Sequence, residues 1–314
     1  MQVILAGKPA QNLSAYGLFQ DAAFNEPIDQ VIPYSLINPL FTDYAIKHRY
    51  VFVPEGKTAT YDPNDAFDFP IGTVLVKNFG YGRGDDAYKI ETRLLIHKKD
   101  GWAAYPYVWN EAQSEAVYAP AGKKLQVNTM GPTGGALEFT YVVPNANQCK
   151  TCHQNGHFIT PIGPKARNLG ASQVLGWHDK NILSDVVGIF EIIPDVQNQD
   201  RPLNGRARAY LDINCAHCHK ETGSASNSGL WLEWGETSPT RLGVRKHPTA
   251  AGRGAGGLTY VIDPGHPETS ILSYRMGSTQ AGVAMPELGR VLAHDEGVAL
   301  IEEWIAAMPY LPSE

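Results

Sequence analysis

Two short cysteine motifs constrain this chain more than any other feature of its sequence. Its four cysteines form two pairs, Cys149/Cys152 and Cys215/Cys218, and a histidine directly follows each pair. C-x-x-C-H is the attachment signature of c-type haem. Two thiols at this spacing can form thioethers with the two vinyl groups of one porphyrin, and the histidine can then reach the iron. The motifs therefore predict two covalently bound haem c groups.

Other uses of paired cysteines fit the sequence less well. A zinc ribbon would place its second pair roughly 15–20 residues after the first, and Cys152 and Cys215 are much farther apart. A thioredoxin-like redox motif does not carry a histidine after each pair, and two disulfides would leave both histidines without a role. We expect His153 and His219 to be the proximal iron ligands, one for each haem.

The second haem has a candidate for its sixth ligand. Met285 stands in the irregular segment 284–287, just before the last predicted helix, and not in an apolar stripe. We expect it to bind the iron, and His/Met coordination raises the reduction potential of a haem. Methionine is also a common core residue, and Met276 is the alternative ligand.

No sixth ligand can be assigned to the first haem from the sequence. His157 follows His153 by four residues, so on a helix both side chains would project from the same face. His97, Met130 and His178 remain candidates, as do another ligand from the β-rich part and the absence of any protein ligand. No arrangement of residues points to a catalytic group, so none is assigned.

The part of the chain before the first motif has the patterns of β-structure. Alternating apolar residues in 137–143 indicate a strand. Asp100-Gly101 separates two apolar runs, 91–96 and 102–109, and this dipeptide favours a hairpin. We interpret residues from about 45 to 144 as an antiparallel sheet or sandwich.

The last third of the chain carries helical patterns. Segment 204–214 places Ala207, Tyr210 and Leu211 on one helix face and runs directly into the second cysteine motif. A further helix is predicted to begin near Asp295, because acidic residues are favourable at a helix N-terminus. Its apolar stripe is Val298, Ile301, Trp304, Ile305 and Met308.

Several segments near the second motif resemble a class I cytochrome c domain. In that family a helix leads into C-x-x-C-H, a loop methionine binds the iron, and the last helix packs across the first. The resemblance implies thioethers at Cys215 and Cys218 and iron ligation by His219 and Met285. It rests on segments 206–219, 270–276, 285–286 and 296–308.

From about residue 14 onward the chain is similar to a group of bacterial diheme c-type cytochromes with an extra N-terminal region. This similarity is carried by segments 39–56, 69–79, 90–95, 101–116 and 144–153. The resulting fold prediction is an α+β chain. It has a β-rich N-terminal domain in residues 1–144, a first haem-binding segment in 145–200, and an all-α class I cytochrome c-like domain with the second haem in 201–314. An extended segment, and not an amphipathic helix, leads into the first motif.

The resemblance implies single-electron transfer between redox partner proteins in the periplasm, with donor and acceptor unidentified. We expect an exported chain without its signal, or one anchored through a removed N-terminus. A net charge of −6 gives no basic surface for nucleic acid. No apolar stretch approaches the roughly 20 residues of a membrane span. The alternatives are a peroxidase-like haem enzyme with an open sixth site at the first haem, and a partner-binding module.

Overall fold

The computed structural model describes residues 2–84, 87–186, 191–249 and 251–309. Its chain divides into two compact units, and each is assembled from separate stretches of sequence. The first unit comprises Met1–Ile37, Tyr44–Lys150 and Phe158–Ile192. The second unit comprises Asn38–Asp43, Thr151–His157 and Ile193–Glu314.

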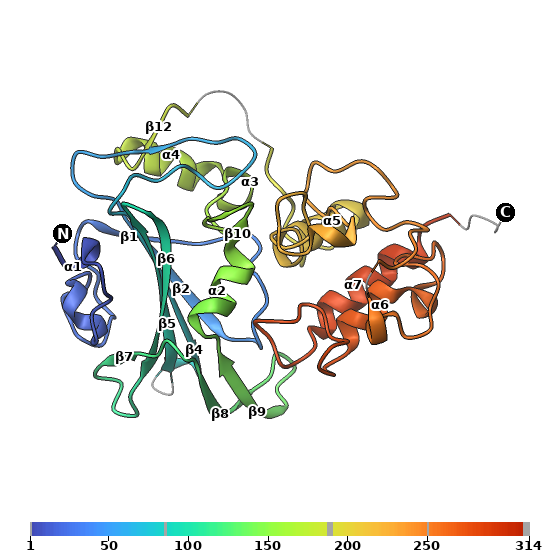
Figure 1. Ribbon diagram of the computed structural model, residues 1–314, viewed down its shortest axis with the longest axis horizontal. Helices are drawn as coiled ribbons and strands as arrows, with labels where there is room; N and C mark the ends of the chain where they lie inside the picture. The colour runs from blue at the N-terminus through green and yellow to red at the C-terminus, as the bar shows by residue number, and fades with distance from the viewer. Residues whose placement is uncertain (1, 85–86, 187–190, 250, 310–314) are drawn as a thin grey trace. The chain divides into compact units, whose positions relative to one another are not determined.

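A six-stranded antiparallel sheet forms the centre of the first unit (Figure 1). The hairpin predicted around Asp100-Gly101 is confirmed, since Ile96 lies opposite Ala103 and Glu91 opposite Val108. Gly101 adopts a φ of +112°, which side-chain-bearing residues rarely do. In spatial order the strands are β1 (Val31–Tyr34), β2 (Ile46–Phe52), β4 (Val74–Tyr81), β5 (Tyr88–Lys98), β6 (Gly101–Trp109) and β7 (Ala116–Tyr118).

Smaller elements complete the first unit. Strands β8 (Lys123–Met130) and β9 (Ala136–Val143) form a separate antiparallel pair. Strand β3 (Ala59–Thr60) pairs in parallel with β12 (Leu183–Ser184). The remaining elements are α1 (Gln2–Leu5), the 3-10 helix η1 (Leu13–Tyr16), β11 (Phe158–Ile159), α3 (Ala166–Leu169) and α4 (Ala171–Asp179).

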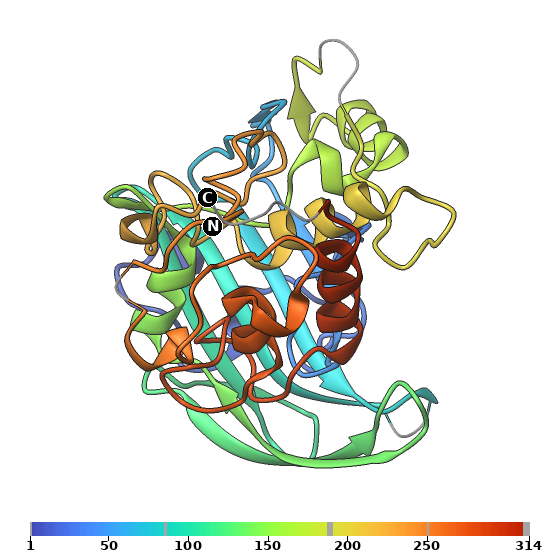
Figure 2. The same cartoon turned by 90° about the vertical axis from the view of Figure 1, so that its right-hand side faces the viewer.

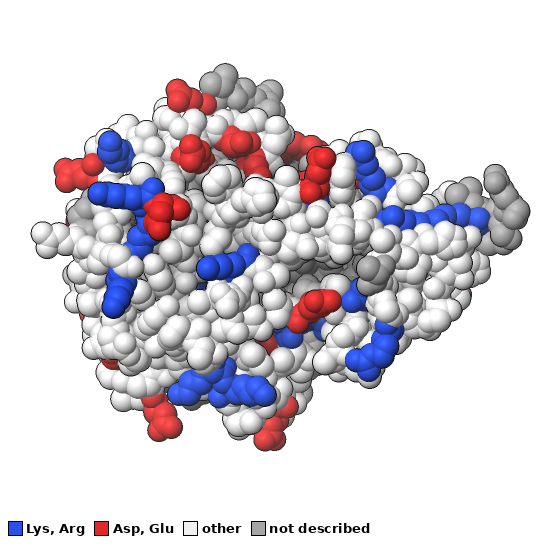
Figure 3. All heavy atoms as spheres, viewed as in Figure 1, with Lys and Arg blue, Asp and Glu red and all other residues white. Residues whose placement is uncertain are grey.

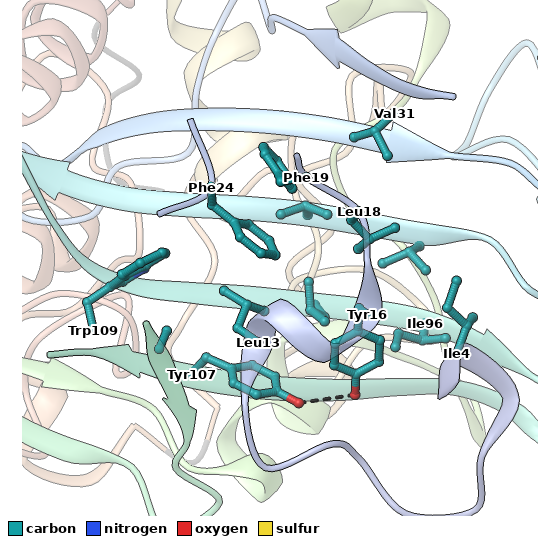
Figure 4. Close-up of a cluster of buried hydrophobic side chains, with 14 residues drawn as sticks. Ile4, Leu13, Tyr16, Leu18, Phe19, Phe24, Val31, Ile96, Tyr107 and Trp109 are labelled. Atoms are coloured by element: carbon teal, nitrogen blue, oxygen red, sulfur yellow. Dashed lines mark hydrogen bonds between the residues drawn. The ribbon is translucent and has the colours of Figure 1, made fainter. Parts of the chain in front are cut away.

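Both faces of the sheet are buried, and successive residues of its central strands belong to different cores. Val74 and Val76 join one apolar cluster, whereas Leu75 joins the other. Figure 4 shows the first cluster, where α1, η1 and the segment after them cover the sheet. There the Tyr107 hydroxyl lies 3.1 Å from that of Tyr16. The second cluster buries side chains of α3 and α4.

The second unit corrects the predicted fold class. The expectation of a separate all-α class I cytochrome c-like domain is wrong: the described structure is 24% helix and 25% strand, with seven α-helices and a large antiparallel sheet. The long connection between α5 (Leu203–Asn214) and α6 (Ile271–Gly277) folds mainly into turns and 3-10 helices. Glycines such as those in 252–257 explain this, because glycine disfavours helix interiors.

The remaining elements of the second unit are short, apart from its last helix. That helix, α7 (Asp295–Ala306), is continuous (Figure 2). The others are β10 (Gln154–Asn155) and the 3-10 helices η3 (Ser226–Ser228), η4 (Gly252–Ala255) and η5 (Pro267–Thr269). No helix in the described part of the chain is long and apolar enough to span a membrane.

Helices α5 and α7 pack through the apolar stripes predicted from the sequence. Leu211 of α5 and Ile301 of α7 are both fully buried members of one cluster. The two helices approach closely at Gly297, where an added Cβ would lie 2.5 Å from the Cε2 atom of Tyr210. A glycine at this position therefore allows the helix contact.

Replacing Gly297 by alanine is expected to destabilise the protein by about 2 kcal/mol, because overpacking of a close contact costs roughly 1–3 kcal/mol. Urea unfolding followed by circular dichroism would measure the change. Gly277→Ala is the matched control, since an added Cβ there meets nothing within 4 Å. Equal stabilities of the two variants would contradict the close contact.

Candidate functional site

The second unit contains a cavity of about 550 Å³ at the second cysteine motif. Cys215, Cys218, His219 and Met285 all line it, so the structure brings together the residues predicted for the second haem. Its volume falls within the roughly 300–1,000 Å³ of small-molecule and cofactor pockets. Much of the wall is apolar and includes Leu230, Leu232, Val261, Ile271, Leu272 and Met276.

The second motif forms a tight turn at the end of α5. The amide of Cys215 still donates to the Leu211 carbonyl at 3.0 Å, as in a helix. The amides of Cys218 and His219 then both donate to the Cys215 carbonyl, at 3.1 and 2.9 Å. Asn214 anchors this turn, because its Oδ1 accepts from the amide of Phe41 at 2.8 Å.

The environment of His219 leaves one of its ring nitrogens, Nε2, available to bind a metal. The Ser228 hydroxyl donates to the Ala225 carbonyl at 2.7 Å. It therefore accepts from the Nδ1–H of His219, which lies 3.1 Å away. This hydrogen bond leaves Nε2 unprotonated. Burial lowers the pKa of His219 to about 4, so the imidazole is neutral at neutral pH.

The two thiols of the second motif have opposite electrostatic environments. Burial, followed by the neighbouring Cys218, raises the pKa of Cys215 to about 12. A hydrogen bond with the Cys152 side chain lowers the pKa of Cys218 well below its usual range. Cys152 also lines the cavity. One thiol of the first motif therefore contacts one thiol of the second.

A single arginine holds the segment that carries Met285. The Arg290 Nη2 atom donates to the carbonyls of Met285 at 2.6 Å, Ser278 at 2.9 Å and Met276 at 3.1 Å. The Met285 amide in turn donates to the Arg275 carbonyl at 3.0 Å. Met276 is 5% exposed and belongs to the apolar core, whereas Met285 is half-buried at the cavity. Met285 is thus the more accessible of the two candidate ligands.

The first motif lies in helix α2 (Ala146–His153). The boundary between the two compact units falls within this helix, between Lys150 and Thr151. Cys149 and His153 do not line the cavity. Cys149 is 7% exposed in the first unit, and burial raises the pKa of its thiol. The structure therefore does not bring the whole first motif to the cavity.

The other candidate ligands for a first haem are also absent from the cavity lining. His97 stacks on Trp102 with ring centroids 4.7 Å apart, and its Nδ1 lies 2.6 Å from the Phe69 carbonyl. Met130 is 65% exposed. His178 is exposed and lies 3.7 Å from an Asp179 carboxylate oxygen. None of these contacts indicates a metal ligand.

Sequence reasoning missed the residues that support the cavity from a distance. Ser228 orients His219, and Arg290 fixes the Met285 segment. The Asp43 carboxylate accepts from the amides of Val291 and Leu292, both at 2.8 Å, almost 250 positions away in sequence. No local pattern identifies such residues, because their roles depend on contacts between distant segments.

The donor set fits a porphyrin. The described residues contain no group of three or more His, Cys, Asp or Glu side chains that could hold a metal ion by itself. Haem iron needs fewer protein donors, because the macrocycle supplies four nitrogens and the protein supplies the axial ligands. Two thiols, a neutral imidazole and a thioether at one largely apolar cavity meet those needs.

Comparisons of the chain with known protein families, curated proteins and solved structures find no match.

Proposed function

We propose that the protein is a diheme c-type cytochrome that transfers single electrons between periplasmic redox partners. The observation that carries this proposal is the cavity at the second C-x-x-C-H motif. It gathers both thiols and a neutral His219 whose Nε2 atom is left for a metal. A haem bound there supplies a one-electron iron couple.

The chain's own residues have distinct roles in this proposal. Cys215 and Cys218 would hold the haem covalently, and His219 would bind its iron from the position set by Ser228. Met285 would supply a further iron ligand, and Arg290 keeps the Met285 backbone in place. The apolar wall excludes water, and a less polar surrounding is one of the factors that tune a haem potential.

The contact between the two motifs supports placing the first haem close to the cavity of the second motif. We assign Cys149 and Cys152 as its attachment points and His153 as its proximal ligand. The hydrogen bond between Cys152 and Cys218 brings one attachment residue of each motif together. Short separation between two attachment sites favours electron exchange between the cofactors that they hold.

Surface charge would affect the association of the protein with its redox partners. The chain has a net charge of −6, and cationic and anionic side chains are interspersed on the face shown in Figure 3. Partner encounter should therefore depend on ionic strength, because salt screens interactions between exposed charges.

The intact mass of the exported, purified chain tests the proposal directly: it should include two covalent haems.

Replacing Met285 by alanine is expected to abolish the red charge-transfer band of His/Met coordination while both haems stay attached. Loss of the thioether should also lower the reduction potential of the second haem. Absorption spectroscopy and redox titration would measure both changes. Met130→Ala is the matched control, because Met130 is 65% exposed. A persistent band in the Met285 variant would move the assignment to Met276.

A further inference from the structure

One face of the six-stranded sheet carries three cationic side chains in a row. Arg49 of β2 lies opposite Lys77 of β4, and Lys77 lies opposite Arg93 of β5. Residues directly opposite each other in neighbouring strands share one face, with their Cβ atoms about 4.5–5.5 Å apart. We call these three residues the cationic row.

A carboxylate balances only one end of the cationic row. Glu91 is fully buried and forms an ion pair with Arg93 at 2.5 Å. Its carboxylate also accepts a hydrogen bond from the Tyr141 hydroxyl. Glu91 is therefore already committed to Arg93 and Tyr141.

The other two cations of the row have no carboxylate partner in the described part of the chain. Arg49 is 7% exposed, and its Nη2 atom makes no hydrogen bond there. Its Nη1 atom makes one long contact, 3.4 Å, with the Lys47 carbonyl. The Lys77 ammonium forms no ion pair in those residues and lies 4.8 Å from the centroid of the Phe79 ring.

Electrostatics make this arrangement unfavourable without an anion. Burial lowers the pKa of Lys77 well below its usual value, and the nearby charges of Arg49, Lys47 and Arg93 lower it further, whereas the charge of Glu91 acts in the opposite direction without reversing the shift. Burial also lowers the pKa of Arg49. Desolvated like charges side by side cost free energy unless an opposite charge compensates them. Two negative charges would balance Arg49 and Lys77.

We propose that the cationic row binds a dicarboxylate, with its two carboxylates paired to Arg49 and Lys77. Two sources supply this chemistry: the two carboxylates of a haem attached at Cys149, or a free small dicarboxylate. Cys149 favours the haem, because its thiol interacts electrostatically with Arg93 and Glu91 in the same unit. The assignment of the two carboxylates to a haem rests on the proposed function, whereas the proposal that this row binds a dicarboxylate does not.

Titration of the full chain with succinate at constant ionic strength tests the proposal. The haem-free wild-type chain should bind succinate. Arg49→Gln and Lys77→Met should each raise the Kd for succinate at least tenfold, as expected for loss of an ion pair. Arg49→Lys keeps the charge and should retain much of the affinity. Lys98→Met is the matched control, because Lys98 is buried in the same sheet and donates to the Ala6 carbonyl at 2.7 Å.

The haem-loaded chain distinguishes the two sources. No succinate binding to the loaded chain would assign the site to haem carboxylates, and unchanged binding would assign it to a free dicarboxylate. The proposal is overturned if the haem-free wild type does not bind succinate, or if the Arg49 and Lys77 variants bind it normally. Circular dichroism of each variant shows that it is folded. An intact mass without haem would refute the proposed function. The succinate titration would still show whether the cationic row binds a dicarboxylate.

Discussion

The double variant Cys215→Ala/Cys218→Ala is expected to carry one covalent haem fewer than the wild-type chain. The variant removes both thiols proposed to form thioethers at the cavity, so His219 and Met285 could hold a haem there only by coordination. Intact mass spectrometry and haem staining of denaturing gels would count the covalent groups. The remaining haem should belong to the first motif, and Cys149→Ala/Cys152→Ala should remove that one instead.

Lys150→Ala serves as the control for this experiment. Lys150 is exposed and occupies a variable position of the first motif, so both haems should remain attached. An unchanged haem count in the Cys215/Cys218 double variant would show that the cavity does not attach haem. A wild-type chain without any haem would refute both attachment sites.

Replacing Glu91 by glutamine is expected to lower the free energy of unfolding by about 3 kcal/mol. Glu91 is fully buried and accepts two hydrogen bonds from Arg93, at 2.5 and 3.0 Å. Breaking a buried ion pair typically costs roughly 3–5 kcal/mol, because one charge is left without compensation. The Arg93 side chain is 25% exposed, so we expect the lower end of this range. Urea unfolding would measure the change.

Glu138→Gln is the matched control for the Glu91 variant. Glu138 is exposed on β9 in the same unit, and surface substitutions usually change stability by less than about 0.5 kcal/mol. The double variant Glu91→Gln/Arg93→Met should recover part of the loss, because it removes the uncompensated cation. A loss below about 1 kcal/mol in Glu91→Gln would show that the pair contributes little to stability.

Local sequence patterns predicted much of the secondary structure. The Asp100-Gly101 turn lies between β5 and β6 as expected, and the apolar stripes of α5 and α7 face each other in one core. These features depend on residues close together in sequence, through turn conformation and side-chain periodicity. The prediction of an all-α cytochrome c-like domain was wrong. The helical patterns at the two ends of this segment do not determine the conformation of the long glycine-rich connection between them.

The sequence of the two C-x-x-C-H motifs was enough to make covalent haem the leading hypothesis, because both thiols and the adjacent histidine of each motif lie within five residues. Only the tertiary structure showed which distant residues lie beside the second motif and beside one another in the sheet. It brought Cys152 to the cavity of the second motif, placed Ser228 and Arg290 behind His219 and Met285, and set Arg49 beside Lys77. The physical reason is that strand register and loop packing depend on contacts between distant segments, which no local spacing records.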